Sequence, residues 1–292
     1  MLNSLRLKFN LAFLSLFGLG LAVAGWVSQG LLVHSARSET VQDAQILMET
    51  AAAARSYTTE QMVPILQPLL TDRFLPQSVP SFSATENLQR LRVRFPDFSY
   101  KEAALNPTNP RDRASDWEAD VVQKLRDDPR QTEYIGERET ATGTALYIAR
   151  PIRIKDDACL TCHSTPAAAP KTMLALYGPS NGFGWQLNDV IGAQIVSVPM
   201  AVPLERAHLL FRTFMLSLVA IFAAVFVAFN LMFHWIVTRR LARLTRAAND
   251  VSLGKNSEAS FETEGRDEIS QLAQAFGRMR ISLASAMSML GA

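Results

Sequence analysis

The sequence predicts an α+β domain between two membrane-spanning helices, followed by a pair of amphipathic helices. Three observations support this. Residues 11–33 and 213–237 are long, uncharged apolar stretches. Residues 146–154 and 191–198 are short and rich in β-branched side chains, which is typical of strands. Over residues 241–283, apolar residues recur every three or four positions, as in heptad helices.

Each apolar stretch is long enough to cross a hydrocarbon layer of roughly 30 Å as a helix. Positive charges lie on one side of both stretches. Arg6 and Lys8 precede the first, and the second is followed by Arg239, Arg240, Arg243 and Arg246. The positive-inside rule therefore places both ends of the chain in the cytoplasm. In a bacterium this predicts a multi-pass protein of the inner membrane with a periplasmic domain.

These boundaries predict the division of the chain. The parts are a cytoplasmic N-terminus (1–10), the first helix (11–33), the periplasmic domain (34–212), the second helix (213–237), a C-terminal helical pair (238–286) and a tail (287–292). An alternative for the first stretch is a signal peptide cleaved at Ala24, because Ala22-Val23-Ala24 resembles a cleavage site. The apolar run continues to Val33, which favours an uncleaved anchor. The net charge of +2 does not indicate nucleic-acid binding.

Both cysteines of the chain stand in the run Cys159-Leu160-Thr161-Cys162-His163. CxxCH is the spacing at which haem is attached through two thioethers, and its histidine becomes an iron ligand. The run therefore predicts one covalent haem c, attached to Cys159 and Cys162, with His163 as the proximal ligand. Such attachment is completed outside the bacterial inner membrane, in agreement with the predicted topology.

Other interpretations of the CxxCH run fit less well. A thioredoxin-like CxxC begins a helix in a βαβ unit and does not need the following histidine. A structural zinc site needs four ligands, and the sequence offers no second ligand pair. A disulfide over so short a loop stabilises little. No Ser/His/Asp set, paired-carboxylate motif or phosphate loop is present in the sequence, so we expect no enzymatic activity.

The external segment begins with apolar residues at helical spacing. They predict a helix that is capped at Ser38 or Thr40, continues the first membrane helix outward and ends near Pro64. The haem run itself lies between the two predicted strands, and its many glycines and prolines predict loops and short helices. The remaining predictions are a loop over 74–87, a turn over 106–110 and a helix over 116–126.

Several stretches of the external segment resemble the Tll0287-like domain, a haem c domain that also occurs as the extracytoplasmic sensor of bacterial signalling proteins. These stretches are 101–110, 116–120, 149–151, 159–166, 177–178, 182–185, 191–193 and 196–199. They cover most of residues 40–205. The resemblance implies a PAS-like fold, in which a five-stranded antiparallel sheet and helices hold one haem c.

The distal ligand of the iron stays open. The resemblance implies a distal cysteine, but haem attachment uses both cysteines of this chain. Met48 and Met62 are the preferred candidates, because they lie on or beside the helix that leads from the first span. Water and an open position are alternatives, and each methionine is equally a core residue by type. The other candidate side chains are Met173, Met200, His34 and His208.

Haem propionates are anionic and favour cationic or hydroxyl partners. The candidates for this role are Arg55, Tyr57, Lys101 and Arg150, and ordinary solvation on the surface is the alternative for each. Trp117 and Trp185 are expected to pack either on the porphyrin or in the protein core.

The C-terminal helical pair resembles a HAMP domain, and Asp267-Glu268-Ile269 at the start of its second helix strengthens this. Its apolar stripe consists of Leu241, Leu244, Ala248 and Val251, then a connector with Gly254, then Ile269, Leu272, Phe276, Met279 and Leu283. Arg240 stands where the family has a proline. A generic coiled coil is the alternative. A HAMP domain implies a parallel four-helix bundle of two chains, and therefore a homodimer.

The combined interpretation is a membrane-bound haem c sensor of redox state or of a diatomic gas. It signals across the membrane through the HAMP domain to a separate output partner, because only nine residues follow Leu283. The alternative is a membrane-tethered c-type cytochrome that carries electrons, with the HAMP domain as a dimerising anchor.

Overall fold

The computed structural model describes residues 5–253 and 265–290, and its chain forms two compact units. The larger unit comprises residues 23–212, and the other comprises residues 1–22 and 213–292. The predicted connector with Gly254 lies outside the described residues, as do residues 1–4 and 291–292.

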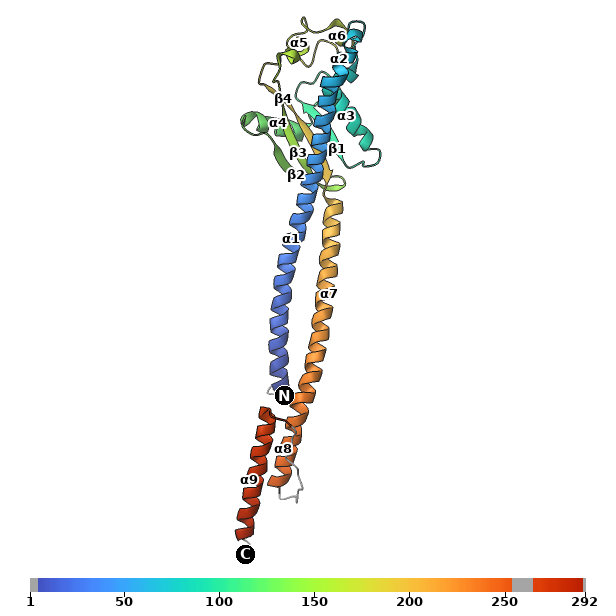
Figure 1. The fold of residues 1–292 in the computed structure, drawn as a ribbon. Helices are drawn as coiled ribbons and strands as arrows, with labels where there is room; N and C mark the ends of the chain where they lie inside the picture. Colours follow the sequence, from blue (N-terminus) through green and yellow to red (C-terminus); the bar gives the residue numbers. More distant parts are fainter. Residues whose placement is uncertain (1–4, 254–264, 291–292) are drawn as a thin grey trace. The chain divides into compact units, whose positions relative to one another are not determined.

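The larger unit is built on a four-stranded antiparallel sheet with the strand order β1-β4-β3-β2 (Figure 1). The central strands β3 (Gly143–Arg153) and β4 (Val190–Pro199) are the two predicted strands. The edge strands β1 (Ser99–Ala104) and β2 (Tyr134–Thr140) were not predicted. The resemblance implied five strands, whereas this sheet has four in the part of the chain that the structure describes.

Helices cover both faces of the sheet because the side chains of its central strands alternate. Leu146 and Ile148 of β3 face α1 (Leu5–Tyr57) and α3 (Pro80–Leu91) on one side. Tyr147 and Ala149 face α4 (Asp116–Asp127) on the other. Strand side chains point alternately to opposite faces, so each face has its own apolar layer.

α1 is continuous over 53 residues, so the predicted outward continuation of the first apolar stretch is confirmed. The predicted cap at Ser38 or Thr40 is wrong, because the Thr40 hydroxyl donates to the carbonyl of Ala36 inside the helix, at 2.9 Å. The helix ends at Tyr57, before a π-helical turn (Thr58–Met62) and the short α2 (Val63–Leu66). Pro64 therefore lies inside α2 and does not end α1.

Two further predictions concern the segment before β2. The loop over 74–87 is only partly correct, because a 3-10 turn (Pro76–Ser78) is followed by α3, which begins at Pro80. Proline suits the first position of a helix, where its missing N–H group is not needed. The helix over 116–126 is confirmed as α4, and Ser115 and Glu118 form a capping box at its start.

The smaller unit is helical among its described residues. It holds most of α7 (Ala201–Phe233), a π-helical turn (His234–Thr238), α8 (Arg239–Ser252) and α9 (Glu268–Leu290). The first part of α1 contacts α7 through aromatic rings, with Phe17 and Phe222 centred 4.4 Å apart. The helical runs Arg6–Leu69 and Ala201–Ser252 are long and apolar enough to cross a membrane.

α8 and α9 pack through part of the predicted stripe. Leu244 and Ala273 are buried at the centre of the contact. The half-buried residues around them are Ala247, Ala248, Val251, Ile269 and Phe276. Leu272 of the predicted stripe is 44% exposed within one chain, where Ala273 takes the inward position. Met279 and Leu283 are also exposed, at 58% and 53%.

Arg240, which departs from the HAMP pattern, forms an ion pair with Asp267 at 2.7 Å. Asp267 also accepts hydrogen bonds from the Ser270 amide (2.8 Å) and hydroxyl (2.6 Å). These bonds, followed by the charge of Arg240, hold the pKa of Asp267 below its ordinary value. Asp267 thus both caps α9 and joins it to the start of α8.

We expect this cap to depend on pH. The pKa of Asp267 is lower in the folded chain than in the unfolded chain. The cap therefore stabilises α9 fully at a pH above the ordinary pKa of aspartate, and this stabilisation is lost as the pH falls through the lowered pKa of the folded chain. Hydrogen exchange over the first turn of α9 measures the effect. Asp267→Ala should reduce protection there about fivefold at neutral pH, as expected for a lost N-cap. Asp250→Ala, which removes an α8 acid, is the control and should leave protection unchanged.

Candidate haem-attachment site

The CxxCH run folds as a tight helical turn. Cys159 ends a 3-10 turn (Asp157–Cys159), and the rest of the run forms α5 (Leu160–His163). The Asp156 carboxylate accepts a hydrogen bond from the Ala158 amide at 2.8 Å, which caps this turn. Residues three apart share one face of such a turn, so both thiols are presented on the same side. Both cysteines are free and half-buried.

The segment that carries the run is a closed excursion between β3 and β4. Its two ends meet where the Ile154 amide donates to the Asp189 carbonyl (2.9 Å) and the Asn188 amide donates to the Ile154 carbonyl (2.7 Å). Besides α5, the excursion holds α6 (Lys171–Tyr177). This confirms the predicted loops and short helices between the two strands.

The ring of His163 is held by three groups. Its Nδ1 lies 2.7 Å from the Gly182 carbonyl oxygen, and because a carbonyl can only accept, Nδ1 carries the hydrogen. The Thr108 hydroxyl lies 3.4 Å from the same nitrogen. The Trp185 ring stacks on the imidazole, with centroids 3.8 Å apart and planes 14° apart. This tautomer leaves the lone pair of Nε2 available to a metal ion.

Burial also keeps His163 neutral. It lowers the pKa of the imidazole, and the opposing effect of the Gly182 carbonyl is smaller. Only the neutral ring can coordinate a metal ion. Burial raises the pKa of the Cys162 thiol, and the nearby Cys159 adds a smaller effect in the same direction.

Gly182 lets two loops approach each other closely around His163. Its φ is +82°, and a Cβ at this position would overlap Thr108. Next to it, the Gly184 amide donates to the Ser164 carbonyl (2.9 Å) and the Trp185 amide to the His163 carbonyl (3.3 Å). Thr108 and Gly182 were not predicted as site residues. The Gly-Phe-Gly-Trp run at 182–185 was the available signal, since paired glycines mark close backbone contacts.

These residues fit a covalently bound haem. Two free thiols lie three residues apart on one turn, and a neutral imidazole follows them. Its Nδ1–H group is bonded to a backbone carbonyl, as is usual for histidines that ligate metals. The described residues contain no group of three or more His, Cys, Asp and Glu side chains that would hold a metal ion without a porphyrin.

The structure brings only some of the predicted haem-contacting residues near the run. Trp185 lies on His163, and Arg55 is close enough to Cys159 for an electrostatic interaction. Tyr57 is 60% exposed at the end of α1. Trp117 packs edge-on against Tyr147 beside α4, at 5.2 Å.

The other two predicted cations have carboxylate partners. Lys101 binds Glu118 at 2.7 Å. Arg150 binds Glu49 of α1 at 2.7 Å and Glu133 at 2.8 Å. Their roles as propionate partners stay predictions, and a bound propionate would have to compete with these carboxylates.

The candidate distal ligands fall into three groups. Met48 and Met200 are buried in the apolar layer between α1, α3 and the sheet. His34 and His208 are exposed on α1 and α7. Met62 ends the π-helical turn after α1, and Met173 is buried on α6.

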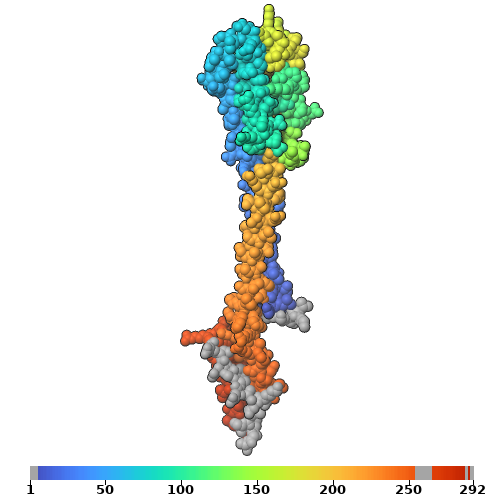
Figure 2. Space-filling model, turned by 90° about the vertical axis from the view of Figure 1, so that its right-hand side faces the viewer, coloured from blue at the N-terminus to red at the C-terminus, as the bar shows by residue number. Residues whose placement is uncertain are grey.

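Met62 and Met173 belong to elements at the same end of the larger unit as α5. Figure 1 places α2, α5 and α6 at that end, and Figure 2 shows the yellow excursion beside the blue to cyan segment there. The Thr172 hydroxyl donates to the Leu70 carbonyl at 3.4 Å, and Phe74 contacts Tyr177 edge-on at 5.9 Å. These contacts join the chain after α1 to α6.

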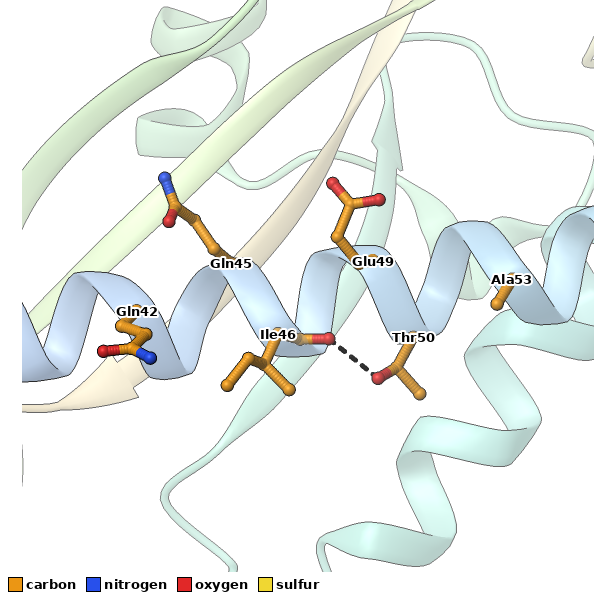
Figure 3. A pocket seen from close by; sticks show the side chains of 6 residues that line it. All are labelled: Gln42, Gln45, Ile46, Glu49, Thr50 and Ala53. Atoms are coloured by element: carbon orange, nitrogen blue, oxygen red, sulfur yellow. Dashed lines mark hydrogen bonds between the residues drawn. The ribbon is translucent and has the colours of Figure 1, made fainter.

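A shallow hollow lies elsewhere, on one side of α1 (Figure 3). Its lining residues are Gln42, Gln45, Ile46, Glu49, Thr50 and Ala53. Figure 3 shows Gln45 and Glu49 pointing toward one edge of this face of the helix and Ile46 and Thr50 toward the other. The Thr50 hydroxyl donates to the Ile46 carbonyl at 2.7 Å. The CxxCH run does not contribute to this hollow, so it is not the haem site.

Comparisons with known proteins match both parts of the chain. The model of the family Tll0287-like matches residues 33–199, and the HAMP domain model matches residues 225–285. One solved structure, the crystal structure of the cyanobacterial heme-protein Tll0287, matches with 16% identity and a TM-score of 0.37, covering 57% of this chain and 92% of that one. No curated protein matches. The family resemblance seen in the sequence is therefore confirmed, and neither matched domain is catalytic.

Proposed function

This chain belongs to the Tll0287-like family and carries a HAMP domain after it, and from this we propose that it is a membrane-bound haem c sensor. The proposed attachment residues are Cys159 and Cys162, and the proposed proximal ligand is His163. The geometry of His163 is the observation that carries the proposal, because its tautomer and burial suit metal coordination.

The residues around His163 have separate roles in this proposal. Gly182 accepts the Nδ1–H hydrogen bond and fixes the ring orientation. Trp185 covers one face of the imidazole and keeps water from it. A bound haem supplies an iron that changes its oxidation state or takes a diatomic ligand. The periplasmic domain would thereby respond to redox state or to a gas.

The rest of the chain supports transmission across a membrane. A HAMP domain and two helices of sufficient length and apolarity indicate a membrane-anchored signalling protein. We infer that both helices cross the bacterial inner membrane, with residues 34–212 in the periplasm. Apolar Leu272, Met279 and Leu283 are exposed in one chain and would be covered in a HAMP dimer. The signal would then pass to a separate output protein.

One observation favours an alternative proposal, a tethered electron carrier. Both attachment cysteines are half-buried, so the edge of a haem attached there would lie near the surface, where electrons are exchanged. The fold is the same in both proposals. They differ in whether the HAMP helices respond to the haem.

Crosslinking distinguishes the two proposals. Met279→Cys carries the only free thiol once haem has been attached. Its yield of interchain crosslinking by a bis-maleimide, which needs no oxidant, reports the α9 arrangement. For a sensor we expect this yield to change at least twofold between the ferric, ferrous and CO- or NO-treated protein. An equal yield in every state, together with fast exchange with periplasmic electron donors, would support the carrier and contradict the sensor.

We further propose Met62 as the distal ligand, because it lies in the segment after α1 whose later residues contact α6 of the excursion, while Met48 belongs to the core. Met62→Leu should therefore remove the methionine-to-iron absorption band of the ferric protein. Met48→Leu is the matched control and should keep the band, since this swap nearly conserves volume and costs less than about 1.5 kcal/mol. Loss of the band in Met173→Leu, but not in Met62→Leu, would show that Met173 is the ligand.

A further inference from the structure

A buried network of polar side chains lies between the end of α1 and the sheet. Glu102 of β1 is only 5% exposed, and both of its oxygens accept hydrogen bonds from Arg55 Nη1, at 2.6 and 2.5 Å. The Tyr100 hydroxyl donates to Glu102 at 2.7 Å, and the Gln194 amide donates to that hydroxyl at 3.2 Å. The network therefore joins α1, β1 and β4.

Stability alone is a weak reason for such a network. The cost of removing two charges from water offsets much of their attraction, so an apolar pair of similar volume often serves as well. Burial acts to lower the pKa of Arg55, but the effect of Glu102 is upward and outweighs it. The guanidinium therefore stays charged. The chain thus holds a fixed pair of opposite charges inside the domain.

This network lies within electrostatic reach of the haem run. Arg55 stands three residues before the turn that leads to α2, and Figure 1 places α2 at the same end of the domain as α5. At this end Arg55 lies close enough to Cys159 for its charge to be felt there. The other charges near Glu102 have nearby partners of opposite sign, because Lys101 pairs with Glu118 and Arg111 contacts Asp112 at 3.3 Å. A change of charge at the run therefore acts on Arg55 in particular.

Arg55 also stands at the end of the helix that leads to the first candidate span. It lies in the last turn of α1, directly before the π-helical turn. Two other ion pairs, Arg37 with Glu137 and Glu49 with Arg150, tie α1 to the sheet, and their acids are 41% and 65% exposed. Among the described residues, the ion pair between Arg55 and Glu102 is the one between α1 and the sheet in which the carboxylate is buried.

We propose that Arg55 and Glu102 form a charge-sensitive latch, through which the charge of the haem site sets the position of the end of α1. The proposal rests on the proposed haem function. A one-electron donor that reduced a ferric haem held there would make the site more negative by one charge. Arg55 would then be drawn toward it and hold Glu102 less firmly, which would loosen the last turns of α1. A continuous helix transmits such a displacement along its length.

Reduction potentials of the full-length holoprotein test the electrostatic step. Glu102→Gln leaves the Arg55 charge unopposed and should raise the haem potential, whereas Arg55→Gln leaves the Glu102 charge and should lower it. We expect each change to be about tenfold in the reduction equilibrium, or about 59 mV for one electron. The double variant R55Q/E102Q should return close to the wild-type potential. Shifts of the same sign in both single variants would overturn the proposal.

Hydrogen exchange tests the mechanical step. In the ferrous wild type, exchange over residues 52–62 should be at least threefold faster than in the ferric protein. This difference should vanish in R55Q/E102Q, although its potential is near normal. Persistence of the full difference in the double variant would also overturn the proposal. R37Q/E137Q, which removes an exposed ion pair of the same helix, is the matched control and should keep the difference.

Two features keep these outcomes distinct from failure of the proposed function. Absence of covalent haem in the wild type, seen by haem staining after denaturing electrophoresis, would contradict haem binding and not the latch. If a single variant fails to fold because one buried charge is unpaired, the double variant still tests the mechanical step. Arg55→Lys, which keeps the charge, then tests the electrostatic step. Its reduction equilibrium should stay within about threefold of the wild-type value.

Discussion

Replacing both Cys159 and Cys162 with serine is expected to abolish covalent haem attachment. The two thiols are the only ones in the chain, and a thioether cannot form without them. Haem staining after denaturing electrophoresis should show no signal at the mass of the polypeptide. Each single replacement should leave at most one thioether and reduce the stained fraction at least tenfold.

His163→Ala separates attachment from ligation. Both thiols remain, so residual covalent haem is expected, but the absorption spectrum should lose the features of a histidine-ligated iron. Ser164→Ala, a change next to the site, is the control and should bind haem as the wild type does. Normal histidine ligation in His163→Ala would contradict the assignment of the proximal ligand.

Gly182→Ala is expected to disturb the site almost as severely. A Cβ at this position would overlap both the backbone and the side chain of Thr108, so the Gly182 carbonyl must move away from His163. The imidazole would then lose the hydrogen bond that fixes its tautomer and orientation. We expect a tenfold to hundredfold loss of correctly ligated haem, the usual effect of losing such an outer partner. Haem spectra per unit of protein measure it.

Gly184→Ala is the matched control for this prediction. Gly184 has nearly the same φ, +80° against +82° for Gly182, but an added Cβ there meets nothing within 4 Å. Both substitutions carry the conformational cost of a left-handed residue, about 1–2 kcal/mol. Only Gly182→Ala adds the overlap. Equal effects of the two substitutions would show that close approach to Thr108 is unimportant.

The sequence predicts the central elements of the fold better than its edges. Strands β3 and β4 are apolar on both faces because each is covered by helices, and their composition therefore indicates strands. Edge strand β2 exposes Glu137 and Glu139, and β1 contains Lys101 and Glu102. Such charged residues are common at sheet edges, where they discourage pairing with other chains, but they hide a strand from pattern analysis.

The site shows a similar division. The CxxCH run is local in sequence, so its spacing alone identifies the attachment residues. Thr108 and Gly182 meet at His163 only because the fold brings two distant loops together. Arg55 was predicted as a propionate partner, whereas its partner in the structure is the buried Glu102. Glu102 lies 47 positions later in the chain, so no local pattern reveals the pair. Partners of this kind depend on the register between α1 and the sheet.

The closed excursion between β3 and β4 bears on how this protein is assembled in the cell. Its ends are fastened by the bonds between Ile154 and residues 188–189, while neither apolar layer of the sheet includes a residue from 155–189 among those described. We therefore expect the sheet and its helices to fold before haem is attached. In that order, the maturation machinery would receive a domain that is already folded and would have to reach two half-buried thiols on its excursion.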